Sequence, residues 1–325
     1  MIDKLELRLP PLTPLSPRVR EFILESRHFK NSTRTMSSGR YERVTDIRPV
    51  GIDALLHYGL KRKENEPHAG EHKLELLDTS KKSYSGLAMQ IEGCFDCAPD
   101  DLEIMRIDLC ADMDGVPVEW FLNRTRIKFK RVAHEVGLLK YQRVGKAGIQ
   151  TISAGKRPNI VRIYDKVAEY KDQLQKLQRK RSRDAEELTL MHEFGIAEDA
   201  TITRVERQFG GGRIPAKIDC FGLLPRLLDF NPFASVEILN GTGSKIPTIP
   251  KIGLDAWLTG TRLSQLHREM GEQQFRRWLN ANSTGNGARY RKKYEAFLNP
   301  ELDRTITAQT IFETYRESVA KQLTA

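Results

Sequence analysis

Residues 159–166 read NIVRIYDK, and this stretch decides how the centre of the chain folds. In an extended strand, successive side chains point to opposite faces of the sheet. Val161 and Ile163 therefore share one face, while Arg162, Tyr164 and Lys166 share the other. A phenol with a cation two residues away on each side is arranged for an anionic partner, because either cation lowers the cost of a phenolate and can bind a phosphate beside it. A half-exposed tyrosine at the rim of a sheet is the alternative interpretation.

Two further segments alternate in the same way, residues 105–112 (MRIDLCAD) and residues 202–209 (ITRVERQF). One face of each segment carries charges of both signs: Arg106, Asp108 and Asp112 in the first, and Arg204 and Glu206 in the second. If neighbouring strands bring the three carboxylates together, their oxygens form a site for Mg²⁺ or Mn²⁺. Alternatively, these acids are only salt-bridge partners of the arginines on the same three strands.

The pattern around these segments is that of a mixed chain of helices and strands. Residues 149–154 and 160–166 are expected to form a hairpin, and residues 72–78 and 87–92 are expected to be strands. Residues 116–124 have the spacing of a helix, with Trp120 and Phe121 in the core. Because the strands alternate and are not continuous apolar runs, the sequence predicts an α+β fold with an antiparallel sheet.

Composition narrows the classes of protein that the chain can represent. The 325 residues suffice for one large domain or two smaller ones. Lys and Arg number 53 against 43 Asp and Glu, and the net charge of +10 is typical of proteins that meet polyanions. The chain has no apolar run of membrane-spanning length, and prolines interrupt its first twenty residues, so we expect neither a membrane span nor a secretory signal. Four cysteines fit reduced thiols in a cytoplasm.

Cations also cluster in three short segments outside the alternating strands: Lys156 and Arg157, Lys180 and Arg181, and Arg291 and Lys292. The first pair lies in the loop before the tyrosine strand, and the second lies in a charged helical stretch beyond it. A run of charge is commonly a solvated face, so this interpretation and a contact to a nucleic-acid backbone both stay open. In residues 289–294 (RYRKKY) the cations alternate with two tyrosines, which suits backbone binding with base stacking, or a core face.

Three motifs, in this order and spacing, resemble those of rolling-circle replication initiators. They are R-I-D (residues 106–108), Y-x-K-x-x-E (residues 164–169) and R-V-E-R (residues 204–207). The resemblance is to the plasmid replication-initiation-factor type and to the filamentous-phage replication nickase. Residues 1–10 (MIDKLELRLP) also look like the start of the phage protein.

The resemblance implies a fold and a division of the chain. The fold is α+β, with a curved, largely antiparallel sheet, helices packed on one face and the active site on the other. Residues 1–250 would form the catalytic nicking and joining domain. Residues 251–325 would form a helical C-terminal region that binds DNA or a partner.

The resemblance also implies chemistry in which Tyr164 attacks a phosphodiester, leaving a free 3′-hydroxyl and a 5′-phosphotyrosine bond. Asp108, Glu206 and Asp112 would bind Mg²⁺ or Mn²⁺. None of the seven histidines is separated from another by a single residue, so the metal would rest mainly on carboxylates. The remaining catalytic residues would be Lys166, which stabilises the phenolate or the phosphate, Arg162, which positions the DNA backbone, and Glu169, which is a metal ligand or the partner of Lys166.

The expected substrate is a single-stranded or supercoiled origin, and the expected DNA contacts are Arg106, Lys156, Arg157, Lys180, Arg181, Arg204, Arg291 and Lys292. The expected partners are a host helicase and, in a homodimer, a second copy of the chain, with no membrane partner and a cytoplasmic location. A conjugative relaxase would use the same tyrosine chemistry. A noncatalytic DNA-binding regulator is the other alternative, but the retained tyrosine, lysine and acids favour an enzyme.

Overall fold

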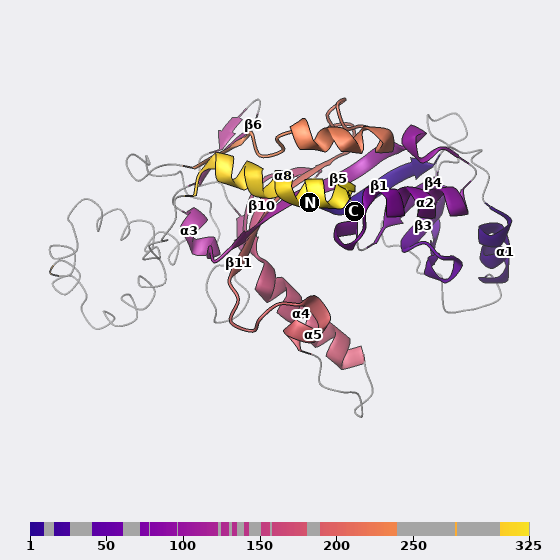
Figure 1. Cartoon of the computed structure of the whole chain (residues 1–325), viewed down its shortest axis with the longest axis horizontal. Helices are drawn as coiled ribbons and strands as arrows, with labels where there is room; N and C mark the ends of the chain where they lie inside the picture. Colours follow the sequence, from indigo (N-terminus) through magenta and orange to yellow (C-terminus); the bar gives the residue numbers. More distant parts are fainter. Residues whose placement is uncertain are drawn as a thin grey trace.

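The computed structural model describes most of the chain outside one long segment near the C-terminus. The statements below concern residues 1–9, 16–26, 41–60, 72–77, 79–95, 97–122, 125–129, 132–134, 140–142, 151–156, 158–180, 189–238, 277 and 306–324. Long strands form the centre of the molecule, and helices lie around them (Figure 1).

A nine-stranded sheet forms this centre, with the strands in the order β2-β3-β4-β1-β5-β11-β10-β9-β8. Every neighbouring pair is antiparallel, and the sheet is curled. The strands are β1 (Ile2–Leu9), β2 (Tyr41–Asp46), β3 (Ala54–Leu60), β4 (His72–Leu76), β5 (Glu103–Asp114), β8 (Lys140–Gln142), β9 (Thr151–Lys156), β10 (Asn159–Asp165) and β11 (Ile202–Gly210). A smaller sheet joins β12 (Val236–Ile238), β6 (Thr125–Phe129) and β7 (Val132–His134). The predicted α+β class with a curved, largely antiparallel sheet is therefore confirmed.

One face of the main sheet is apolar and forms the core, as alternation requires. Leu5 and Leu7 of β1 and Ile107 and Leu109 of β5 are fully buried in it. The helix α8 (Ala308–Thr324) packs against β5 and against the 3₁₀ segment η5 (Phe221–Asp229). Its Tyr315 is buried in the same core, where its ring meets Phe233 edge to face at 5.7 Å.

The remaining helical elements are shorter than α8, and α2 among them packs against α8. They are α1 (Pro17–Ser26), α2 (Tyr84–Cys94), α3 (Val118–Leu122), α4 (Lys166–Lys180) and α5 (Leu190–Phe194), with short 3₁₀ turns η1 (Arg48–Val50), η2 (Thr79–Lys81) and η3 (Pro99–Asp101). Helices α4 and α5 pack on each other around a separate apolar cluster. In Figure 1 this pair extends away from the sheet, on the side away from α8. None of the helices among the described residues is both long and apolar enough to span a membrane.

Three local predictions can be compared with the elements observed. The hairpin is confirmed, because β9 and β10 pair with Asn159 opposite Lys156. The helix expected within residues 116–124 is also confirmed as α3. The strand expected over residues 87–92 was wrong, because these residues belong to α2. The Ser83 side chain accepts a hydrogen bond from the Gly86 amide at 3.1 Å and starts this helix, and Leu87 and Ile91 share its buried face.

The end of the predicted C-terminal region is part of the sheet's own core. The buried Gln322 of α8 accepts a hydrogen bond from the Ile2 amide at 2.8 Å and donates one to the Thr79 carbonyl at 2.5 Å. The last helix therefore holds the first strand in place. The predicted boundary at residues 250 and 251 itself lies outside the described residues.

Candidate active site

The three polar strand segments of the sequence are neighbours in the sheet, in the order β5-β11-β10. Tyr164 lies opposite Arg204, which in turn lies opposite Asp112 on β5. Two residues before Tyr164 on β10, Arg162 lies opposite Glu206. Directly opposed residues of antiparallel strands project from the same face, so these side chains gather on the side of the sheet opposite the core.

Tyr164 is a buried phenol whose hydroxyl is directed at an acid. Its side chain is 9% exposed, and its hydroxyl donates a hydrogen bond to Oε2 of Glu206 at 3.1 Å. Burial raises the pKa of Tyr164 well above the usual range, the negative charge of Glu206 raises it further, and Arg204 lowers it. The two flanking cations lie farther away, with Arg162 Cζ and Lys166 Nζ each 5.9 Å from the ring centroid. The resting state is therefore a neutral phenol beside a proton acceptor.

Glu206 links this phenol to a guanidinium group. Its Oε1 accepts hydrogen bonds from Nε and Nη2 of Arg162, the first at 3.0 Å, while its Oε2 faces Tyr164. The residue is 1% exposed. Burial raises the pKa of Glu206 and Arg162 lowers it, with the net direction upward. The carboxylate is thus held in position at both oxygens and has an increased affinity for a proton.

Asp108 is a second buried acid beside the same arginine. Arg106 donates to it from Nε at 2.9 Å and also from Nη2, and Arg162 Nη2 lies 3.8 Å from its Oδ2. Burial raises the pKa of Asp108, against the opposing charge of Arg106. Arg162 therefore stands between the carboxylates of Asp108 and Glu206.

These two acids are the part of the structure that fits the predicted metal ion. Carboxylate oxygens are the donors that Mg²⁺ and Mn²⁺ prefer, and both acids are buried on adjacent strands. Within the described part of the chain, no cluster of three or more His, Cys, Asp or Glu side chains is arranged to hold a metal. Asp108 and Glu206 thus have the donor type that such an ion prefers, and the guanidinium of Arg162 lies between their carboxylates.

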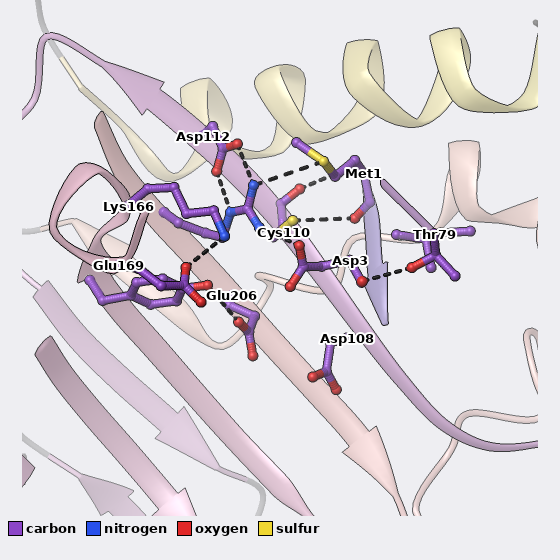
Figure 2. Close-up of polar contacts among 12 residues, drawn as sticks. Met1, Asp3, Thr79, Asp108, Cys110, Asp112, Lys166, Glu169 and Glu206 are labelled. Carbon is purple, nitrogen blue, oxygen red and sulfur yellow. Dashed lines mark hydrogen bonds and ion pairs between the residues drawn. The ribbon is translucent and has the colours of Figure 1, made fainter. Parts of the chain in front are cut away.

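The third predicted ligand, Asp112, belongs to a separate ion pair. Nε and Nη2 of Arg204 each donate to one of its oxygens at 2.6 Å, and Nη1 of Arg204 donates to Asp3 (Figure 2). Arg204 is 2% exposed, so a contact of this guanidinium with DNA would require these pairs to open. The structure pairs the partly exposed Asp112 with the buried Arg204 and not with Asp108 and Glu206.

The sequence interpretation missed Asp3, which Figure 2 shows facing the same group of side chains. Simple alternation puts Asp3 on the core side with Leu5. The pairing of β1 with β5 shifts between Ile2 and Lys4, and this bulge leaves Asp3 as the extra residue. Thr79 then fixes the turned backbone by donating to the Asp3 carbonyl at 2.7 Å.

Lys166 and Glu169 form a pair where β10 becomes α4. Asp165 accepts a hydrogen bond from the Ala168 amide at 2.9 Å and begins the helix. Lys166 is 5% exposed, and its Nζ lies 2.6 Å from Oε2 of Glu169 (Figure 2). Of the two roles considered for Glu169, the structure shows the partner of Lys166.

The structure describes some of the predicted DNA contacts and not others. Arg106 is half-buried and bound to Asp108. The side chains of Lys156 and Lys180, and all of Arg157, Arg181, Arg291 and Lys292, lie outside the described residues. On the described part of α4, the cations that are exposed are Lys171, Lys176 and Arg179.

No protein-family model matches the chain, and no curated protein matches it at significant similarity.

Proposed function

We propose that this protein is a metal-dependent DNA nicking and joining enzyme, which initiates rolling-circle replication through a 5′-phosphotyrosine intermediate. The observation that carries this proposal is the hydrogen bond from the Tyr164 hydroxyl to Glu206, a buried acid that Arg162 holds in place. A nucleophile with an adjacent proton acceptor, itself oriented by a third group, is the arrangement required for covalent catalysis. The net charge of +10 supports a polyanionic substrate.

In the first step, the Tyr164 oxygen attacks the phosphorus of the scissile phosphodiester. Its proton passes to Oε2 of Glu206, 3.1 Å away in the resting state. The bond from phosphorus to the 3′ oxygen breaks, and that oxygen leaves as a hydroxyl with a proton returned by Glu206. Burial raises the pKa of Glu206, which increases its affinity for the proton that it takes from Tyr164.

The charged side chains around the tyrosine would hold the phosphate during this step. Arg162 is the nearest guanidinium to Glu206 and would bind the phosphate oxygens, because its planar donors match them. The Nζ of Lys166 lies 5.9 Å from the centroid of the tyrosine ring and would offset the charge that develops there. Asp108, together with Glu206 in its ionised form, would hold Mg²⁺ or Mn²⁺, and such an ion would polarise the scissile phosphate.

The substrate in this proposal is a single-stranded or supercoiled origin in the cytoplasm, opened further by a host helicase. A relaxase would use the same side chains on a transfer origin. A noncatalytic regulator would have no use for a tyrosine directed at a buried acid, so this contact favours an enzyme over a binding protein.

The test is a covalent adduct with DNA. A pool of random single-stranded oligonucleotides labelled at the 3′ end is incubated with the protein and Mn²⁺, then resolved under denaturing conditions. We expect a labelled protein band whose modified peptide contains Tyr164, and its loss in Tyr164→Phe, which removes only the attacking oxygen. Adduct formation that is undiminished in Tyr164→Phe, or in excess chelator, would contradict the proposal.

A further inference from the structure

One guanidinium lies between the two buried acids of the candidate active site. Nε and Nη2 of Arg162 donate to Oε1 of Glu206, the first at 3.0 Å, and the same Nη2 lies 3.8 Å from Oδ2 of Asp108. The acids project from the neighbouring strands β5 and β11 (Figure 2). The Arg162 side chain is 29% exposed, whereas those of Asp108 and Glu206 are 3% and 2% exposed. Arg162 is thus the most accessible member of the group, and its Nη2 stands near both of the oxygens that a shared cation would contact.

Each acid has a second partner that does not depend on Arg162. Arg106 donates to both oxygens of Asp108, and the Tyr164 hydroxyl donates to Oε2 of Glu206. Both carboxylates would therefore stay in place if Arg162 turned away. The position of its Nη2 would then be open to another cation.

Charge determines which cations can share this position. When both acids are ionised, their two negative charges face the two positive charges of Arg106 and Arg162, so the group is neutral. A divalent ion added to this group would leave two positive charges uncompensated in a buried site, which is costly. A divalent ion and Arg162 in its observed position are therefore mutually unfavourable.

A DNA phosphate changes this balance in two ways. Its oxygens match the planar donors of Arg162, so a phosphate at the surface of the site would attract the guanidinium away from the acids. Its oxygens also serve as metal ligands, since Mg²⁺ is commonly held by one or two carboxylates together with substrate phosphates. Among the described residues, no third His, Cys, Asp or Glu side chain joins the two acids in a group that could hold a metal. A phosphate therefore supplies the ligands that Asp108 and Glu206 need.

We propose that Arg162 keeps divalent metal ions out of the site in the free protein, and that a DNA phosphate draws it away, so that metal and DNA bind cooperatively. The inference deepens the proposed function and rests on its metal ion and DNA substrate. Because coupling between binding sites is reciprocal, the metal must strengthen DNA binding by the same factor by which DNA strengthens metal binding. A metal ion is then loaded beside Tyr164 only when a phosphate is in place.

The first test measures Mn²⁺ binding without DNA, by the loss of the electron paramagnetic resonance signal of the free ion. Arg162→Gln removes the guanidinium charge. Lys73→Gln is the matched control, since Lys73 is also a partly buried cation on the polar face of the sheet, bound to Glu6 at 3.1 Å. We expect Arg162→Gln to bind Mn²⁺ at least about tenfold more tightly than the wild type, and Lys73→Gln to stay within about twofold. Adding Asp108→Asn to Arg162→Gln should remove the gain, which would place the ion at the two acids.

The second test measures the reciprocal effect and needs no change at Arg162. Tyr164→Phe is the background, because this variant cannot form a covalent bond with DNA. The fluorescence anisotropy of a labelled random single-stranded oligonucleotide gives the DNA affinity with and without Mn²⁺ at constant ionic strength. We expect Mn²⁺ to tighten DNA binding by at least about fivefold, and Asp108→Asn in the same background to lose this gain.

A folded Arg162→Gln protein whose Mn²⁺ affinity stays within about twofold of the wild type would overturn the inference. If thermal unfolding shows that this variant does not fold, the second test decides, because a DNA affinity that does not respond to Mn²⁺ overturns the coupling by itself. Neither measurement requires DNA cleavage. Failure of the wild-type protein to form a covalent adduct would overturn the proposed function even where metal and DNA bind cooperatively, whereas adduct formation without that cooperativity would overturn only the role of Arg162.

Discussion

The polar face of the sheet has two halves that pair their acids with cations in different ways. In the half formed by β1, β3 and β4, called here the lysine half, Lys4 Nζ lies 2.6 Å from Glu75 and His57 Nε2 lies 3.2 Å from the same carboxyl group. In the half formed by β5, β10 and β11, called the arginine half, Glu206 and Asp108 share Arg162.

The difference appears in the pKa values of the acids. The hydrogen bond with His57 lowers the pKa of Glu75, and the lysines lower it further. Burial raises the pKa values of Glu206 and Asp108 despite their arginines. The side chain of Glu75 is 16% exposed and that of Glu206 is 2% exposed. Desolvation therefore decides the direction, and the acids of the arginine half are the ones with the increased affinity for a proton.

The largest effect should separate the two halves by activity. Glu206→Gln keeps the shape of the side chain but removes the proton acceptor of Tyr164, so we expect the rate of adduct formation to fall by about 10²–10⁴-fold. Glu75→Gln, the matched change in the lysine half, should leave the rate within about twofold of wild type, because it touches no reacting group. Initial rates of adduct formation at saturating Mn²⁺ provide the measurement. Similar losses in both variants would mean that the halves act as one unit.

The same two variants should show stability changes of opposite pH dependence. The folded-state pKa of Glu75 is lowered, so its stabilisation is present above the unfolded pKa near 4.5 and is lost as the pH falls through the folded value. Glu75→Gln should therefore cost about 1–3 kcal/mol at pH 7 and less in acid. The pKa of Glu206 is raised, so its contribution is present below pH 4.5 and is lost as the pH rises. The stability of Glu206→Gln minus that of the wild type should therefore be greater at pH 7 than at pH 4. Urea unfolding at each pH measures both trends, and trends of the same sign would contradict the comparison.

A substitution in α8, on the core face of the sheet, should destabilise β1, the strand by which the lysine half pairs with β5 of the arginine half. Gln322→Leu leaves the Ile2 amide and the Thr79 carbonyl without their buried partner, which should destabilise the fold by about 1–3 kcal/mol. Gln309→Leu on the same helix is the control, since this exposed side chain bonds to Glu313 one turn along the helix, and its effect should stay within about 0.5 kcal/mol. Urea midpoints give the values. Equal effects would show that the contact of α8 with β1 contributes little.

The smallest effect concerns cations outside both halves. Lys176 and Arg179 are exposed on α4, and if they bind phosphates, each change to Ala should flatten the plot of log affinity against log salt by about 0.7–0.9. Lys73→Ala should leave the slope unchanged, because Lys73 is bound to Glu6 at 3.1 Å in the lysine half. Fluorescence titration with single-stranded DNA over a range of salt concentrations measures the slopes. An unchanged slope in the α4 variants would mean that these charges are only solvated.

The comparison also shows where sequence patterns were sufficient. Alternation alone placed Arg162 and Tyr164 on one face and predicted the partners on residues 105–112 and 202–209, because neighbouring antiparallel strands align their faces. It did not assign α2, where a serine cap and residues four apart outweighed a short β-like run. It also placed Asp3 on the wrong face, because a bulge interrupts the alternation of β1 and a bulge cannot be recognised from one sequence.

The sequence by itself determined the α+β class, the polar strand faces and the candidate nucleophile, because these depend on the two-residue period of a strand. Only the tertiary structure decided which acid meets which arginine. Strand register put Asp112 with Arg204 and Glu206 with Tyr164 and Arg162, and the bulge added Asp3 to the first group. Burial then raised the pKa values of Glu206 and Asp108, while His57 and the neighbouring lysines lowered that of Glu75. Register and depth arise from the packing of the whole sheet, and for this reason no local pattern could have predicted them.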